Sequence, residues 1–407
     1  MTTMNHQQDN NAPAAAPTVN VFLKLAPITL AVFIAFMTIG IQLPVLPLHL
    51  HAALGMSTTV VGLVVGAQFV AALLSRAWAG NFADLRGAKR ALQVGALNAS
   101  ASGLLYLVSL SLTDTPAASV ALLLAGRVLL ALGESLIVTG TMGWGIGLVG
   151  PHNGGKVMAW LGMAMFAAYA LGAPAGIALE HQWGFAGIAA ASVLIPLGAL
   201  AVVAGVRAVP PTATRRTPFY KVLGAVWRPG VGLALSSVGF GVITGFIALL
   251  FAAHQWGSAS LAFSAFGAAF IVARLLFGHL PDRLGGARVA LVCVVIEAIG
   301  QWLIWDAHSA SSAYWGAALT GFGYSLAFPG FGVEAMRRAP AQARGLAMGA
   351  YVAFLDIALG VASPLAGWLA TSQGVASVYL GGAVAAALSF LVALLLMLRA
   401  PGTAGHG

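Results

Sequence analysis

Long apolar runs alternate with short polar connections along almost the whole chain. A helix of about 20 residues crosses the roughly 30 Å hydrocarbon layer of a bilayer, and it satisfies its own backbone hydrogen bonds in lipid. The pattern therefore predicts an all-α polytopic membrane protein with 12 transmembrane helices. The predicted helices cover residues 26–48, 58–80, 91–112, 118–147, 156–180, 185–207, 230–253, 259–280, 288–306, 312–335, 344–370 and 376–399.

Composition narrows the class of protein further. Of the 407 residues, 60% are hydrophobic and 7% are charged, which excludes a water-soluble globular protein because such proteins carry about 25% charged residues. The net charge of +9 does not indicate nucleic-acid binding, since the basic residues form short clusters between apolar runs, where lipid headgroups and topology explain them. The single cysteine, Cys293, lies inside an apolar run. We therefore expect no disulfide framework, no metal site and no cofactor.

The distribution of basic residues predicts the orientation of the chain. Of the 19 Lys and Arg residues, 16 fall on the side of the predicted helices that also holds both termini, and the opposite connections hold none. By the positive-inside rule, the N- and C-termini are expected to be cytoplasmic. The predicted parts are a flexible cytoplasmic tail (1–21), an N-terminal six-helix half (22–207), a basic cytoplasmic linker (208–229), a C-terminal six-helix half (230–399) and a second tail (400–407).

The two halves repeat each other in sequence. An even number of helices per half preserves sidedness, so the pattern predicts two parallel six-helix repeats. Such repeats, with a substrate site at their interface, are typical of alternating-access transporters. At an offset of 198, Arg76, Gly80, Asp84 and Gly87 recur as Arg274, Gly278, Asp282 and Gly285. Residues 133–136 (GESL) recur as 323–326 (GYSL) at an offset of 190, and residues 170–172 recur as 358–360 at an offset of 188.

Two copies of a loop motif carry a resemblance to a known family. Residues 80–90 and 278–288 resemble the G-x-x-x-D-(R/K)-x-G-(R/K)-(R/K) signature of the major facilitator superfamily, although the first copy has Leu85 and Ala88 at usually basic positions. We predict that the two copies act as a cytoplasmic latch; alternatively, their charges only solvate a loop and fix topology. The latch residues are Gly80, Asp84, Gly87, Arg90, Gly278, Asp282, Arg283, Gly285 and Arg288.

Each latch residue type suits a physical role. Gly80 and Gly278 would allow close contact between helices, and the later glycine of each copy would allow a tight turn. The aspartates, Asp84 and Asp282, could accept hydrogen bonds from helix N-termini or from neighbouring Arg side chains.

Further motifs refine the resemblance. Residues 126–133, which include Arg127, resemble the Arg-bearing motif of the fourth helix in this superfamily. Residues 354–360 and 363–367 resemble the YhhS-type bacterial branch near the drug and proton antiporters. The resemblance implies a bacterial inner-membrane location and leaves the substrate open. A shortened form of the antiporter-associated Gly-Pro motif is formed by Gly172, Pro174 and Gly176.

Ionisable residues inside the predicted helices are costly in lipid and are therefore functional candidates. Arg127 and Glu134 are seven residues apart on one helix face, so we expect them to share a cavity without forming a tight ion pair. Asp356 has no basic residue in its own helix after Arg344. We predict proton coupling or substrate binding at Arg127, Glu134 and Asp356. The alternatives are structural interhelical hydrogen bonds and, for Asp356, pairing with Arg127 or with another helix.

Other intramembrane residues are weaker candidates. Glu297 lies in the ninth predicted helix, which is peripheral in the resembled superfamily, so its role is open. Arg76 and Arg274 lie one turn before the latch glycines, where we expect them to reach the cytoplasmic surface and act as anchors. A set of polar and aromatic residues borders the central cavity by resemblance, or serves ordinary helix packing instead. This set is Gln42, Gln68, Trp160, Phe240, Thr244 and Tyr324.

These observations predict a secondary transporter that moves small organic molecules by alternating access, with proton-coupled efflux as the leading interpretation. Proton symport or facilitative uptake is the alternative, because a fold does not fix direction. A polytopic membrane enzyme would need a nucleophile and base, or a set of metal ligands, clustered at one membrane face. The sequence offers no such cluster, so we expect a transporter that is not an enzyme. Its expected partners are the lipid bilayer, the substrate and a proton, and we expect a functional monomer.

Overall fold

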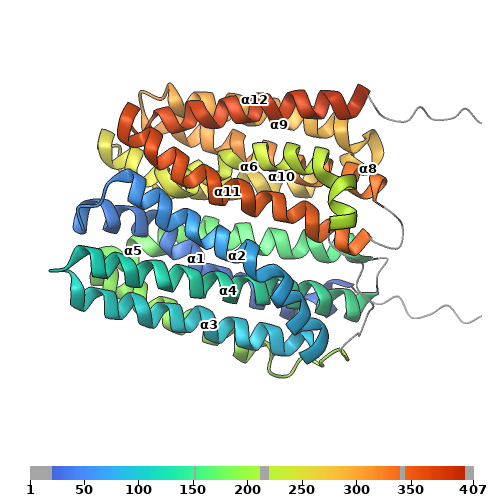
Figure 1. Ribbon diagram of the computed structural model, residues 1–407, viewed down its shortest axis with the longest axis horizontal. Coiled ribbons are helices and arrows are strands. Elements are labelled where there is room, and N and C mark those ends of the chain that lie inside the picture. The colour runs from blue at the N-terminus through green and yellow to red at the C-terminus, as the bar shows by residue number, and fades with distance from the viewer. Residues whose placement is uncertain (1–20, 151–152, 211–219, 340–343, 399–407) are drawn as a thin grey trace, which may run out of the picture.

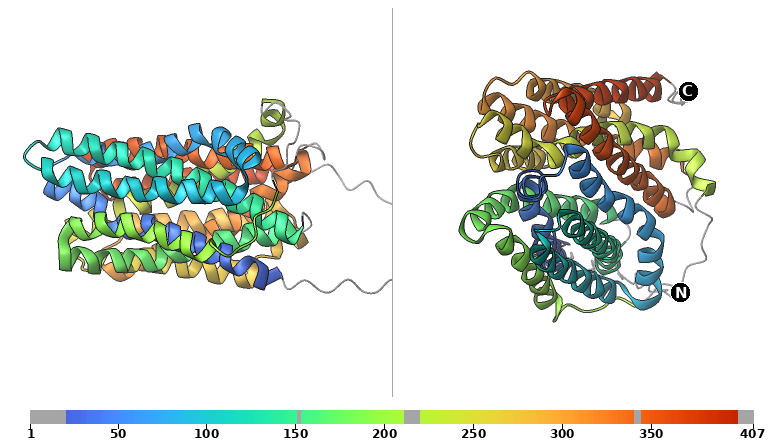
Figure 2. Two further views of the ribbon diagram at one scale, coloured as in Figure 1. Left: turned by 90° about the horizontal axis from the view of Figure 1, so that it is seen from below. Right: turned by 60° about the vertical axis from the view of Figure 1, so that its left-hand side comes forward.

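The computed structural model describes residues 21–150, 153–210, 220–339 and 344–398. The predicted tails lie outside these residues, apart from Val21, and so does the middle of the predicted linker. The described chain is all-helical, as predicted. Its long helices run roughly parallel or antiparallel to one another, and the start of α1 and the end of α12 lie at the same end of the bundle (Figures 1 and 2). We call this the terminal end, and the other end the far end.

The helices follow the predicted apolar runs closely. Helix α1 continues into a π-helical turn (His49–Ala53), and a short helix, α8, precedes α9. The bounds are α1 (Val21–Leu48), α2 (Thr58–Arg86), α3 (Ala88–Ser109), α4 (Pro116–Val149), α5 (Gly154–Val203), α6 (Tyr220–His254), α7 (Ser260–Phe277), α8 (Leu280–Leu284), α9 (Gly286–Trp305), α10 (Ala310–Arg338), α11 (Arg344–Gln373) and α12 (Ser377–Leu398).

Helix α5 contains two of the predicted transmembrane segments. At 50 residues it is about 75 Å long if straight, more than twice the hydrocarbon thickness. The two segments meet at Gly184, whose backbone has φ 60° and ψ −160°. Only glycine adopts such angles readily, so one residue replaces the longer connection that the sequence pattern suggested. Ten described helices are long and apolar enough to cross a membrane, counting α5 once; α10, rich in small and polar residues, is not among them.

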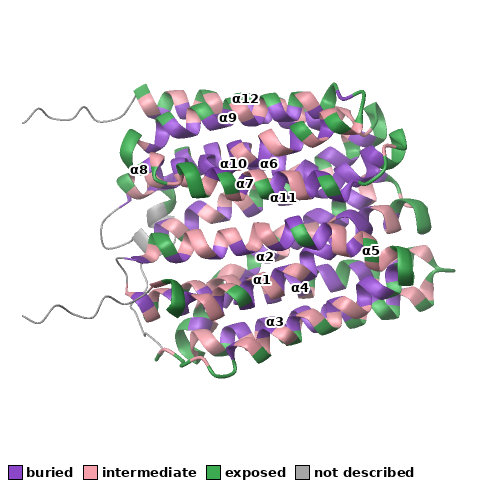
Figure 3. Ribbon diagram, turned by 180° about the vertical axis from the view of Figure 1, so that it is seen from behind, coloured by how far each residue is buried: buried purple, intermediate pink, exposed green. Residues whose placement is uncertain are grey.

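Two groups of helices pack mainly within themselves. Helix α1 packs on α5, and α4 packs on both α2 and α3; in the second group α6 packs on α11, and α10 packs on both α7 and α9. Buried residues lie on the facing sides of the helices, and many exposed residues on the outside are large and apolar (Figure 3). Leu74, for example, is 76% exposed. Such a surface suits lipid as the surrounding solvent.

One hydrogen bond recurs at equivalent places in both groups. Ser135 Oγ on α4 donates to the carbonyl oxygen of Ala72 on α2, at 3.1 Å. Ser325 Oγ on α10 donates to the carbonyl oxygen of Phe270 on α7, at 2.7 Å. The serines are separated by the repeat offset of 190 and their acceptors by the offset of 198. The same contact therefore fixes the same pair of helices in each group.

Small residues join the two groups between α2 and α11. A Cβ atom added to Gly66 would lie 2.8 Å from Pro364 Cδ, and one added to Gly367 would lie 3.0 Å from Thr59 Cα. At the far end, Thr58 Oγ1 donates to the carbonyl oxygen of Gly367 at 3.1 Å. These distances leave no room for larger side chains, so the two backbones approach closely.

Candidate functional site

The largest departure from the sequence predictions is an ion pair between Arg76 on α2 and Asp356 on α11. Arg76 Nε donates to Asp356 Oδ2, and Arg76 Nη2 donates to Asp356 Oδ1 at 2.9 Å, so the contact is bidentate. The Asp356 side chain is 2% exposed and that of Arg76 is 23% exposed. The prediction that Arg76 anchors the surface was therefore wrong, and the partner of Asp356 is Arg76 rather than Arg127. The pair links helices that are 280 residues apart in sequence.

A second carboxyl group lies near the same arginine. Gln68 Nε2 on α2 donates to Glu134 Oε2 on α4 at 2.8 Å. Gln68, Ala72 and Arg76 follow one another at intervals of four residues and so lie along one face of α2. Glu134 lies within electrostatic range of Arg76 as well. The guanidinium thus binds a carboxyl group of α11 directly and interacts electrostatically with one of α4.

Arg127 on α4 occupies a different environment. Its side chain is 4% exposed, and its Nη1 donates to Gln42 Oε1 on α1 at 3.2 Å. Gln42 Nε2 in turn donates to Ser192 Oγ at 3.0 Å. Among the described residues, Arg127 Nε has no hydrogen-bond partner and no carboxylate forms an ion pair with this guanidinium. Arg127 is therefore a buried cation held by the side-chain amide of Gln42.

A small cavity connects Arg127 with part of the predicted cavity-lining set. Its volume is about 20 Å³, and Arg127 lines it together with Gln42, Gln68, Phe240 and Thr244. Glu134 does not line it directly, but reaches it through its hydrogen bond with Gln68.

Trp160 lies elsewhere than predicted. Its ring packs against that of Phe22, in the first turn of α1, with centroids 5.1 Å apart, so it does not join the cavity residues.

Aromatic rings gather beside the cavity on the side of α6, α7 and α10. The rings of Phe240 and Tyr324 are stacked with centroids 5.7 Å apart, and those of Phe166 and Phe270 are stacked at 3.7 Å. The Tyr324 hydroxyl lies 3.4 Å from Ser237 Oγ. We call the group the aromatic cluster; its members are Phe166, Tyr169, Phe240, Phe266, Phe270 and Tyr324.

Arg274 on α7 borders the aromatic cluster. Its guanidinium carbon lies 5.4 Å from the centroid of the Phe270 ring. Its Nε is buried without a hydrogen-bond partner, and no ion pair involves this residue among the residues that the structure describes. The repeat relates Arg274 to Arg76, yet only Arg76 has a carboxylate partner.

The latch motifs lie at the terminal end. The turns predicted at Gly87 and Gly285 are present, with φ of 94° and 93°. The predicted close helix contacts are wrong. A Cβ atom on Gly80 would come no nearer than 4.0 Å to Thr139, and one on Gly278 would meet only its own helix, at Arg274.

The charged latch residues lie at the surface of the terminal end. The side chains of Asp84, Arg90, Asp282, Arg283 and Arg288 are exposed. Next to Arg90, Lys89 Nζ donates to the carbonyl oxygen of Ala204 at 2.7 Å.

Sequence reasoning missed a carboxylate next to the second latch. Glu334, on α10, is 4% exposed and forms an ion pair with Arg338 at 2.6 Å. Its Oε1 also accepts from the backbone N–H of Ala287 at 3.3 Å, in the first turn of α9. The spacing of Glu334 to Arg337 and Arg338, three and four residues, is the signal that could have found it.

Three further candidates are buried: the two glycines of the Gly-Pro motif and Glu297. Gly172 and Gly176 pack α5 on the backbone of α1, since a Cβ atom on either would collide with Gly40 or Ile41. Glu297, on α9, is 0% exposed, and neither of its carboxyl oxygens has a hydrogen-bond partner among the described residues.

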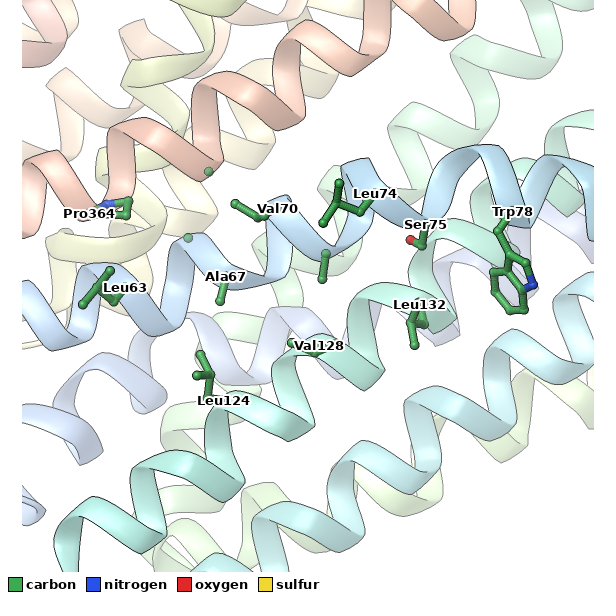
Figure 4. A pocket seen from close by; sticks show the side chains of 13 residues that line it. Leu63, Ala67, Val70, Leu74, Ser75, Trp78, Leu124, Val128, Leu132 and Pro364 are labelled. Carbon is green, nitrogen blue, oxygen red and sulfur yellow. The ribbon is translucent and has the colours of Figure 1, made fainter.

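A wide groove lies away from these charges, on the flank formed by α2, α4 and α11 (Figure 4). It has a volume of about 660 Å³ and is lined by apolar side chains, among them Leu63, Leu74 and Trp78, with Ser75 as its hydroxyl-bearing residue. Leu63 and Trp78 are about half exposed on this outer surface. The groove is therefore a lipid-facing surface.

Comparisons with known proteins agree with this architecture. Residues 28–253 and 230–406 match the sequence profile of the Major Facilitator Superfamily. The chain is 43% identical over 370 residues to an uncharacterized MFS-type transporter of Salmonella typhimurium, covering 91% of this chain and 95% of that protein. It is also 43% identical over 385 residues to an uncharacterized MFS-type transporter of Pseudomonas aeruginosa, covering 94% and 96%.

Solved structures share the fold at low sequence identity. The nucleoside transporter NupG has a TM-score of 0.73 at 13% identity, covering 93% of this chain and 100% of that one. The D-xylose-proton symporter has a TM-score of 0.72 at 16% identity, with coverages of 94% and 99%. The human organic anion transporter MFSD10 has a TM-score of 0.63 at 15% identity, with coverages of 92% and 99%.

Proposed function

Because this chain belongs to the major facilitator superfamily, and is thus a multi-pass membrane transporter and not an enzyme, we propose that it exports a small organic molecule in exchange for protons. We place it in the bacterial inner membrane with both termini in the cytoplasm. The observation that carries the proposal is the ion pair between Arg76 and Asp356, which links the two halves of the molecule in the interior.

The ion pair can act as a proton-controlled bond between the halves. An ionised Asp356 holds the Arg76 guanidinium and ties α2 to α11. Protonation of Asp356 removes its charge, and a guanidinium binds a neutral carboxyl group much more weakly. Arg76 is then free to interact with Glu134, on its own half of the molecule. The proton thereby weakens a contact between the halves and strengthens one within the N-terminal half.

Alternating exposure of Asp356 would give this switch a direction. The close packing of α2 on α11 at the far end, which we take as periplasmic, fits a state that is reached from the cytoplasm. In this state Asp356 is paired, and substrate would bind from the cytoplasmic end. In the opposite state, which opens to the periplasm, a proton from that side would bind Asp356. This would return the transporter to the first state, because the two states differ in their affinity for the proton.

The ion pair can be tested without knowing the substrate. We would place spin labels at Leu85→Cys and Leu284→Cys, both exposed at the terminal end, with the buried Cys293 replaced by Ala. In the otherwise unchanged full chain in nanodiscs, the distance distribution should shift between alkaline and acidic buffer. Asp356→Asn should give one distribution at both, and Glu134→Gln should reduce the shift. Arg228→Gln, an exposed change on α6, is the matched control and should behave as the unchanged chain.

Two results would contradict this proposal. A full pH-dependent shift in both carboxyl variants would mean that neither residue carries the proton. A distribution that does not respond to pH in the unchanged chain would instead favour facilitated diffusion.

Proton symport is the second candidate function, because the same ion pair could couple uptake. Everted vesicles with an acidic lumen separate the two directions. A compound exported in exchange for protons should dissipate the pH gradient when added outside, whereas a symported compound should not.

Reporter fusions test the orientation of the chain. Fusions after residues 54, 115, 183, 256, 309 and 373 should report the periplasm, and fusions after 88, 153, 214, 285 and 340 the cytoplasm. A consistent inversion would reverse the assigned direction.

A further inference from the structure

We propose that Arg274 and the aromatic cluster bind the charged group and the ring system of an aromatic organic anion. This inference rests on the proposed transport function and names the substrate class of the same interior site. It is carried by the geometry of Arg274, which is the repeat counterpart of Arg76 but has no carboxylate partner.

The position of Arg274 on α7 directs it away from lipid. Phe263, Phe270 and Arg274 are spaced by seven and four residues, so they share one face of the helix. The two phenylalanines are 3% and 2% exposed, which makes this the interior face. The following residues, Leu275 and Leu276, are 65% and 58% exposed and form the lipid-facing side. The guanidinium therefore lies among protein side chains.

The repeat explains why this guanidinium has no partner. Asp356 on α11 corresponds to Ala168 on α5 at the offset of 188 that relates these two helices. Ala168 is 0% exposed and cannot bind a cation. Arg76 therefore has Asp356 as its partner, whereas Arg274 lies over Phe270, which stacks on Phe166 of α5, and Ala168 packs against Gly40 on α1. A guanidinium whose Nε is buried without a hydrogen-bond partner or counter-ion in the described chain is costly, and an anionic ligand would supply the missing charge.

The surroundings of Arg274 select for an aromatic ligand. Its guanidinium lies over the Phe270 ring, which stacks on Phe166. Tyr324 and Tyr351 lie within electrostatic range of Arg274. Guanidinium groups bind carboxylates with two parallel hydrogen bonds, and aromatic rings prefer stacked or edge-to-face neighbours. A flat aromatic carboxylate satisfies both requirements.

The test uses the full chain in nanodiscs of zwitterionic lipid, with 1-naphthoate as the probe and neutral 1-naphthamide as its isosteric control. A ligand that binds the folded state raises the apparent melting temperature in a saturable way. We expect saturable stabilisation by naphthoate and not by naphthamide. Arg274→Gln should weaken the apparent affinity for naphthoate by at least about tenfold, since it removes a charge-assisted bidentate contact. Arg274→Lys should weaken it less, and the exposed Arg228→Gln should leave it unchanged.

Loss of a ring provides an independent variant. Phe270→Leu removes the ring over which the Arg274 guanidinium lies, and it should lower the affinity for naphthoate even though Arg274 is retained. Equal stabilisation by naphthoate and naphthamide, absence of stabilisation, or an unchanged affinity in Arg274→Gln would overturn the proposal. Loss of the naphthoate effect in nanodiscs containing phosphatidylglycerol would overturn it as well, because a lipid phosphate would then be the occupant.

Failure of this inference is distinguishable from failure of proton coupling. The label distances respond to pH through Asp356 and do not require naphthoate, whereas the naphthoate affinity depends on Arg274 and does not require a pH change. Naphthoate binding that survives in Asp356→Asn would support anion recognition independently of proton coupling.

Discussion

The two halves of the interior place different chemistry at equivalent positions. Gln68 and Glu134 of the first half form a hydrogen bond of 2.8 Å. Their counterparts at the repeat offsets, Phe266 and Tyr324, are rings whose centroids lie 6.5 Å apart. The surrounding frame is unchanged, because the serine after Glu134 and the serine after Tyr324 make the same bond to the neighbouring helix. A duplicated scaffold has therefore kept its helix contacts while one half became polar and the other aromatic.

The same division applies to the arginines. Arg76 is held by Asp356 across the two halves, while Arg274 faces rings and has no ion-pair partner in the described part of the chain. The comparison indicates that ion handling belongs to the first half together with α11, and that ring binding belongs to the second half. Substitutions at paired positions test this division.

The largest expected effect is that of Arg76→Gln. It leaves Asp356, which is 2% exposed, without its partner, and should lower the free energy of unfolding by about 3–5 kcal/mol. Arg274→Gln should cost less than about 1 kcal/mol, because it breaks no ion pair. Denaturant unfolding in nanodiscs measures both. The double variant Arg76→Gln, Asp356→Asn should recover part of the loss; if both arginine variants cost the same, the contrast between the halves is wrong.

A smaller effect is expected at the next pair of positions. Gln68→Leu removes the donor to Glu134 and should cost about 2 kcal/mol in unfolding free energy. Phe266→Leu keeps an apolar side chain of similar volume and should cost about 1 kcal/mol. Both are measured by the same denaturant titration. A larger loss for Phe266→Leu would show that the rings, and not the polar pair, hold this helix contact.

The serine hydrogen bond that recurs in both halves predicts similar effects on the free energy of unfolding in each half. Ser135→Ala and Ser325→Ala each remove one buried side-chain donor to a backbone carbonyl, at 3.1 and 2.7 Å respectively. Ser135→Ala also removes an acceptor of Ser75 Oγ, which keeps its hydrogen bond to the Ala72 carbonyl oxygen. Each should lower the free energy of unfolding by about 1 kcal/mol. Amide hydrogen exchange of α4 and α10 would locate the loss in the expected half. Very different costs would mean that the two serines are not equivalent.

The smallest expected effect is that of Tyr324→Phe. It removes a hydroxyl that lies 3.4 Å from Ser237 but keeps the ring stacked on Phe240. The unfolding free energy should change by less than about 0.5 kcal/mol, since so long a hydrogen bond is weak. Naphthoate affinity should be retained within about twofold. A much larger loss of affinity would make the hydroxyl, rather than the ring, the feature that the ligand uses.

The helices could be predicted from sequence because lipid imposes a simple rule on apolar length. The segments meeting at Gly184 were both predicted, and only the length of their connection differed, since one glycine with positive φ can turn the chain. Glu134 and Asp356 could be selected individually, because a carboxyl group inside an apolar run is costly wherever it lies.

The partners of these residues could not be predicted in the same way. Arg76 and Asp356 meet only because α2 packs on α11, a contact set by glycines far along the chain. Because Arg76 lies close to a loop motif in sequence, its side chain was predicted to reach the cytoplasmic surface. The helix face on which it lies directs the side chain to the interior instead. Gly80 shows the converse, since a glycine inside a motif need not mark a helix contact. Trp160 was predicted to line the cavity because its helix borders the cavity in the resembled superfamily. The sequence does not show that this residue faces Phe22 instead.

The glycine-lined contact between α2 and α11 has a mechanical consequence. Gly62 and Gly367 present backbone to backbone, and Gly66 faces the rigid ring of Pro364, so few side chains must change rotamer when one helix tilts against the other. Such a contact adds little to the activation barrier for movement of α2 against α11. The activation barrier for rocking would then reside mainly in the Arg76–Asp356 bond, and the pace of the conformational cycle would follow the rate at which a proton reaches Asp356.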